Sequence, residues 1–154
     1  MPRWAASALL LLLAFAGCTS RTTQVAAISA APASGLGTEA EAARAAAIAF
    51  LEAEARGDSA ADTLLAAGAD FLVTGIRVVG RPRLAGINGP GTAAAEEAAV
   101  GTAGALAWVV LAYRVDAQTP ALSERARATF VLEKQSAGWR IRHVHTSMVE
   151  RWER

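Results

Sequence analysis

The sequence LAWVVLAYRV at residues 106–115 is apolar at both alternating sets of positions. Successive side chains of a β-strand point to opposite faces, so this run predicts a central strand that is buried on both sides. Farther along, residues 125–134 alternate, with Ala126, Ala128, Phe130 and Leu132 on one face and mainly charged side chains on the other. This second pattern predicts a neighbouring strand with one polar face.

Turn-forming residues separate further strands on both sides of this centre. Residues 93–102 are rich in alanine and glutamate, which favour helix. The Ala103-Gly104 pair directly before the central strand indicates a hairpin, however, so we expect residues 93–102 to form a strand. A turn at residues 135–138 then leads into a last strand over 139–147.

The N-terminal half predicts helices followed by a strand and a loop. Thr38 and Glu41 fit a capping box, which predicts a helix over residues 38–56 that ends at Gly57. A second, short helix is expected to carry Leu64 and Leu65 and to stop at Gly68. Residues 70–79 are β-rich, and residues 81–92, with two prolines and three glycines, predict a loop. Helices followed by antiparallel strands indicate an α+β fold.

This order of elements, with the terminal stretch GWRIRHVHTS at residues 138–147, resembles a SnoaL-like domain of the nuclear transport factor 2-like superfamily. The resemblance covers about residues 39–150. It implies a cone in which two N-terminal helices pack on a strongly bent antiparallel sheet around an apolar pocket, used for catalysis by some members and only for binding by others. Residues 81–92 depart from the resemblance, because many members carry a third helix there.

Candidate pocket residues come mainly from the predicted strands. His143 and His145 are two residues apart, so we expect them on one face, in one stripe with Trp139, Ile141 and Ser147. The full set of pocket candidates is Phe50, Trp108, Tyr113, Trp139, His143 and His145. The two histidines could serve as metal ligands, as acid–base groups or as polar pocket lining.

Catalysis and metal binding are the less favoured interpretations of this set. In the steroid isomerase branch a carboxylate near the end of the first strand abstracts a proton, whereas the matching residues 73–76 contain no acid and Asp70 lies at the start of that strand. An enzyme would then depend on His145 as base and Tyr113 as hydrogen-bond donor. A His-x-His pair still needs a third protein ligand for zinc, so we expect no metal and no cofactor.

Cys18, the only cysteine, follows a short apolar segment and a small residue, an arrangement that resembles the lipobox of bacterial lipoproteins. The segment is too short to span a bilayer core of about 30 Å, which needs about 20 apolar residues. We therefore expect a signal peptide at residues 1–17, a lipidated Cys18 with a flexible tether at 18–37, and the domain at 38–154. Ordinary signal cleavage after Ala14-Phe15-Ala16 is the alternative. Thr19, rather than an aspartate, follows the cysteine, which is similar to the pattern of Gram-negative lipoproteins that are sorted to the outer membrane.

Charge balance excludes a polyanion-binding surface. The chain has 15 basic residues, of which Arg3 is in the signal, against 14 acidic ones, so we expect no nucleic-acid partner. We expect a membrane-tethered module of the cell envelope, facing the periplasm, that binds a small, mainly apolar ligand or an envelope partner and forms a homodimer through its sheet, without catalysis. The alternative is an isomerase- or cyclase-type enzyme that uses a pocket histidine as base.

Overall fold

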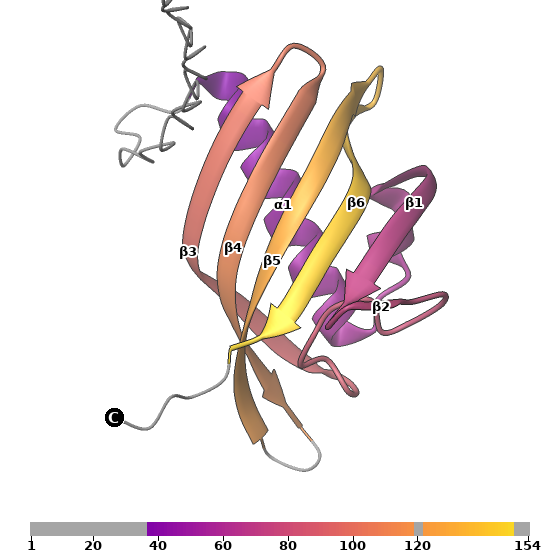
Figure 1. Cartoon of the computed structure of the whole chain (residues 1–154), viewed down its shortest axis with the longest axis vertical. Coiled ribbons are helices and arrows are strands. Elements are labelled where there is room, and N and C mark those ends of the chain that lie inside the picture. The colour runs from indigo at the N-terminus through magenta and orange to yellow at the C-terminus, as the bar shows by residue number, and fades with distance from the viewer. Residues whose placement is uncertain (1–36, 119–121, 150–154) are drawn as a thin grey trace, which may run out of the picture.

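The computed structural model describes residues 37–118 and 122–149, which form two helices and six strands. The expected signal peptide, Cys18 and nearly all of the tether lie outside the described residues. The elements are α1 (Thr38–Arg56), α2 (Ala60–Thr63), β1 (Leu65–Val73), β2 (Ile76–Arg77), β3 (Gly91–Ala103), β4 (Leu106–Ala117), β5 (Leu122–Gln135) and β6 (Gly138–Met148). Figure 1 shows α1 lying across one face of a single curved sheet.

The sheet is mixed, with strand order β2-β1-β6-β5-β4-β3. β3, β4, β5 and β6 pair antiparallel as predicted, but β1 runs parallel to β6. The predicted α+β fold with a strongly bent sheet is confirmed, but the sheet is mixed rather than antiparallel, because β1 pairs parallel to β6. A parallel pair needs a long connection, and here all of β2 to β5 separates the first strand from the last.

Helix α1 buries a stripe of mostly small side chains against the concave face of the sheet. Ala43, Ala47, Phe50 and Leu51 are fully buried, and the alanines allow a close approach between helix and sheet. The predicted end is confirmed, since Gly57 adopts φ 69° and its N–H binds the carbonyls of the last turn. The predicted capping box is wrong, because Gly37 is the N-cap and no side chain caps the helix. Within the described residues no helix is long and apolar enough to cross a membrane.

The segment after α1 differs most from prediction. α2 is a single turn, and Leu65 already lies in β1, where it pairs with Ile141. The predicted strand over residues 70–79 is divided by a turn at Thr74-Gly75, after which β2 returns along β1. Adjacent leucines fit a helix and a buried strand equally well, so only pairing with β6 decides between them.

The chain downstream follows the predicted turns. Residues 93–102 lie in strand β3, and the turns at Gly104 and at residues 136–137 join the strands as expected. The loop predicted over residues 81–92 is confirmed over 81–90, but it begins already at residue 78, where a strand was predicted, and residues 91–92 belong to β3. Three of its side chains, Leu84, Ala85 and Ile87, are nevertheless buried in the core, so this loop contributes to the packing of the interior.

The prediction that β4 is buried on both faces is wrong. Ala107, Val109, Leu111, Tyr113 and Val115 form its buried face. On the other face Leu106 is 52% exposed, Trp108 45% and Val110 38%. The helix covers only one side of the sheet, and no described element covers the other. The sheet thus carries an apolar strip on its outer face.

Candidate functional site

A closed ring of hydrogen bonds ties the loop to the interior of the cone. The Tyr113 hydroxyl donates to the Ala85 carbonyl at 2.9 Å and lies 2.8 Å from Thr146 Oγ1, while the Ala85 N–H donates to Thr146 Oγ1 at 3.4 Å. A hydroxyl carries one hydrogen, so the Thr146 hydroxyl must donate to the Tyr113 oxygen. Each hydroxyl in the ring therefore both donates and accepts.

Within this ring the Tyr113 hydroxyl has a structural role. Tyr113 and Thr146 are buried, and burial raises the pKa of Tyr113 to about 12, although the hydrogen bond with Thr146 acts in the opposite direction. A phenol in this setting stays neutral at physiological pH. Its hydroxyl already holds the loop carbonyl, so a ligand would have to displace the loop to reach it.

The other inward-facing candidates belong to the core. Phe50 stacks on Phe71 with ring centroids 6.1 Å apart and meets Phe130 edge-on at 6.2 Å. Trp139 is also buried. These rings, together with Leu84 from the loop, pack where the sequence predicted an apolar pocket.

A buried ion pair, which the sequence analysis did not identify, lies beside these aromatic rings. Glu54 accepts from the Arg83 backbone N–H at 2.8 Å, from its Nε at 3.3 Å and from its Nη2 at 2.9 Å. The Arg83 guanidinium also lies over the Phe50 and Phe71 rings, at 5.4 and 5.2 Å from their centroids. Burial alone would lower the pKa of Arg83, but its hydrogen bonds to Glu54 keep that pKa above the ordinary value.

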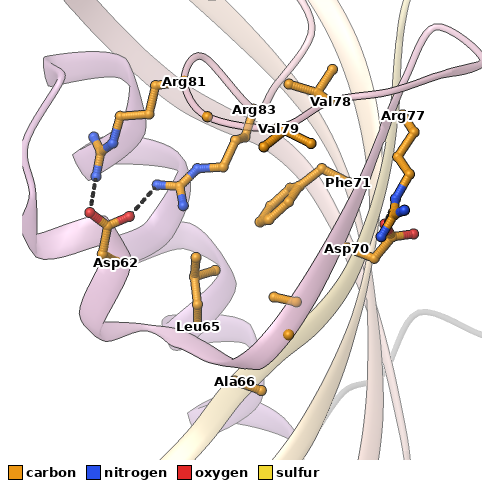
Figure 2. A pocket seen from close by; sticks show the side chains of 13 residues that line it. Asp62, Leu65, Ala66, Asp70, Phe71, Arg77, Val78, Val79, Arg81 and Arg83 are labelled. Atoms are coloured by element: carbon orange, nitrogen blue, oxygen red, sulfur yellow. Dashed lines mark hydrogen bonds and ion pairs between the residues drawn. The ribbon is translucent and has the colours of Figure 1, made fainter.

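Arg83 of this ion pair lines a surface groove between α2, β1 and the loop. Figure 2 shows Arg81 and Arg83 converging on Asp62, with Phe71 and Val78 at the adjoining wall. The groove has a volume of about 620 Å³. The hydrogen bond from Arg83 holds the pKa of Asp62 below its ordinary value, with a further hydrogen bond from Arg81. We call this site the arginine groove.

The histidines lie on the opposite side of the sheet from the core. The register shifts between Leu132↔Ile141 and Val131↔His143, which makes Arg142 an extra residue in β6. Ile141 and Val144 therefore both face inward, whereas His143 and His145 face outward with Ser147. The predicted continuous stripe with Trp139 and Ile141 is wrong, because a one-residue bulge reverses which face the following residues occupy.

The outer face contains two small clusters. His143 Nδ1 lies 3.5 Å from Asp70 Oδ2, and Asp70 accepts from Arg77 Nε at 2.6 Å. That hydrogen bond holds the pKa of Asp70 below its ordinary value. Trp108 lies over Gly101 of the neighbouring strand, where a Cβ on residue 101 would fall 1.9 Å from the indole. Gly101 therefore provides the space in which Trp108 lies flat against the sheet.

The proposed base and donor are not brought together. Tyr113 points into the cone, while His145 points out of the other face of the sheet. One substrate molecule could not contact both side chains in this arrangement. Among residues 37–118 and 122–149, no group of three or more His, Cys, Asp or Glu side chains is placed to hold a metal ion.

Two signals could have revealed part of the ion pair from the sequence. Glu54 stands three residues after Leu51 and four after Phe50, so it continues the apolar stripe of α1. A carboxylate at such a position needs a cationic partner. The identity of that partner, 29 residues away in an irregular loop, could not be read from spacing.

The mixed sheet, the helix on its concave face and the loop-filled cone define an α+β domain of the nuclear transport factor 2-like fold. The family model of the SnoaL-like domain matches residues 43–150. The chain therefore belongs to the SnoaL-like domain family. Comparison with curated proteins found no match.

Solved structures of low sequence identity share this fold. A ketosteroid isomerase-like protein from Erwinia carotovora atroseptica is 20% identical, with a TM-score of 0.54, over 75% of this chain and 100% of that one. An NTF2-like protein with a cystatin-like fold from Novosphingobium aromaticivorans is 15% identical, with a TM-score of 0.57, over 73% and 82%. The S. rosetta CaMKII hub is 20% identical, with a TM-score of 0.56, over 75% and 100%. These likenesses concern the fold alone.

Proposed function

We propose that this protein is a lipid-tethered, non-catalytic binding module of the bacterial cell envelope that pairs with a second copy through the outer face of its sheet. The observation that carries the proposal is the Tyr113-Thr146-Ala85 ring, which seals the loop into the interior where an isomerase would hold its substrate. The domain has its apolar surface outside the cone instead, at Leu106, Trp108 and Val110.

The outer face supports pairing with a second copy. Its apolar strip on β4 is bordered by charges of both signs, including Glu97 and Arg127, which line the same surface depression as Val110. Two copies related by a two-fold axis can place such a mixed border against itself, with each positive side chain near a negative one. One structure of the same fold is the S. rosetta CaMKII hub, whose description as a hub fits a domain used for association.

The tether rests on the sequence around Cys18. A thioether-linked diacylglycerol and an acylated amine would hold the protein stably, because each buried methylene contributes about 0.8 kcal/mol. The linker would then present the domain to the periplasm from the outer membrane. The tethered, paired domain would bind an envelope partner or the small ligand considered below.

Two assays test this function. The full chain, produced in a Gram-negative host with labelled palmitate, should incorporate the label, and Cys18→Ser should not; a Cys18→Ser variant that still incorporates it would contradict the tether. Purified wild-type chain should not isomerise ketosteroid-like substrates. Isomerase activity that disappears in His145→Ala, with the fold intact, would support the enzyme alternative and overturn the non-catalytic proposal.

A further inference from the structure

In the arginine groove, Arg81 and Arg83 form an anion-binding arrangement, and the anion they hold is a carboxylate of the chain itself, that of Asp62. One oxygen of Asp62 lies 2.8 Å from Arg83 Nη2, and the other lies 3.1 Å from Arg81 Nη2. A single carboxylate thus bridges two guanidinium groups, one oxygen to each (Figure 2). A carboxylate from a ligand could make the same two contacts.

The arginine side of this arrangement is built before any ligand arrives. Arg83 is held by three hydrogen bonds to Glu54, whose side chain is only 1% exposed, and by the two phenylalanine rings. Arg81 donates to the Asp58 carbonyl at 2.8 Å and lies 3.7 Å from Glu54. The ordering of these long side chains therefore does not have to be supplied by the ligand.

Asp62, in contrast, is weakly held. Its side chain is 56% exposed and stands on α2, a helix of only four residues. Ion pairs with an exposed partner contribute little to stability, because water screens the attraction and two long side chains lose rotamer freedom. Asp62 can therefore leave the arginines at small cost and with no change in the core.

The groove also supplies a surface for an apolar group. Leu65, Phe71, Val78 and Val79 line it beside the arginines, and the Asp70–Arg77 ion pair, whose charges neutralise each other, lines it as well. Val79 is 94% exposed, so an apolar ligand would remove its side chain from water. Charged donors at one end and apolar side chains along the wall match a ligand with the same two parts.

We infer that the arginine groove binds a small carboxylate with an apolar body, whose carboxylate replaces that of Asp62 on Arg81 and Arg83. The Asp62 side chain acts as an internal competitor that occupies the two arginines when no ligand is bound. The inference depends neither on the lipid tether nor on pairing through the sheet, since the groove residues named here belong to α2, β1 and the loop.

Isothermal titration calorimetry of the full chain in nanodiscs, with empty nanodiscs as blank, tests the inference with benzoate as probe. Benzoate should bind saturably, whereas benzyl alcohol, which lacks the charge, and acetate, which lacks the apolar body, should bind at least about tenfold more weakly. Equal binding of benzoate and benzyl alcohol, or the absence of saturable benzoate binding, would overturn it.

Two variants separate the competitor from the binding groups. Asp62→Asn removes the internal carboxylate and should tighten benzoate binding about two- to fivefold, the range expected when a half-exposed ion pair no longer competes. Arg81→Gln should weaken it about five- to tenfold. Arg44→Gln, which loses an exposed ion pair on α1, is the charge-matched control and should change nothing. Asp62→Asn binding no tighter than wild type would refute displacement, even if Arg81→Gln proved unstable.

Discussion

Replacement of Tyr113 by phenylalanine tests whether the hydrogen-bond ring locks the loop into the cone. The substitution keeps the aromatic ring that packs in the core and removes only the hydroxyl. It leaves the Ala85 carbonyl and the Thr146 hydroxyl, both buried, without their partner. A buried polar group left unpaired costs about 1–3 kcal/mol, so we expect Tyr113→Phe to lower the free energy of unfolding by about 2 kcal/mol.

Urea denaturation of the full chain measures this loss, and a double-mutant cycle with Thr146→Val assigns it to the ring. The two side chains are in direct contact, so the cycle should give a coupling energy of about 1 kcal/mol. Thr129→Val, on the outer face of β5, is the control and should change stability by less than about 0.5 kcal/mol. Additive effects of Tyr113→Phe and Thr146→Val, or a loss below about 0.5 kcal/mol for Tyr113→Phe, would show that the hydrogen-bond ring does not lock the loop into the cone.

The same variant has a pH signature. Folding raises the pKa of Tyr113 from 10.0 to about 12, which means that the folded state favours the protonated phenol. The corresponding stabilisation is fully present below pH 10 and is lost as the pH rises toward 12. Tyr113→Phe should therefore lose less stability than wild type over that interval. An unchanged alkaline dependence would contradict the assigned burial of the hydroxyl.

Three further predictions concern other parts of the fold. Glu54→Gln should destabilise the domain by about 3–5 kcal/mol in urea denaturation because it leaves the Arg83 charge buried without its partner, whereas Glu52→Gln, exposed on the same helix, should be nearly neutral; equal effects would contradict the buried pair. Asp62 has a lowered pKa, so its contribution to stability is lost as the pH falls below about 4, and Asp62→Asn should flatten the acid limb of the stability profile; an identical limb would be evidence against the Asp62 contacts. Gly101→Ala should push Trp108 off the sheet and weaken self-association in sedimentation experiments, and unaltered association would argue against a role for the flat indole.

Local signals predicted much of the fold. The helix over residues 38–56, its glycine end and the hairpin turns depend on neighbours in the sequence, and all three are found in the structure. Residues 93–102 were harder, because their composition favours helix, yet pairing along the whole of β4 makes them a strand. In that segment tertiary pairing outweighs intrinsic propensity.

The candidate site was less accessible from the sequence because its geometry depends on single-residue register and on distant contacts. The extra residue at Arg142 turns His143 and His145 away from the core, and no composition signal marks such a bulge. The apolar run on β4 correctly indicated two apolar faces, but not that one of them lacks a cover within the described residues. The Glu54-Arg83 pair forms only when the loop folds back onto α1.

Native mass spectrometry of the full chain released from nanodiscs tests the proposed pairing through the sheet most directly. Wild-type protein should appear as two copies, and Trp108→Glu should appear as one copy with an unchanged far-ultraviolet circular dichroism spectrum, because the substituted side chain is half-exposed on the outer face. A wild-type protein that is released only as single copies, or a Trp108→Glu variant that remains paired, would contradict pairing through the outer face of the sheet.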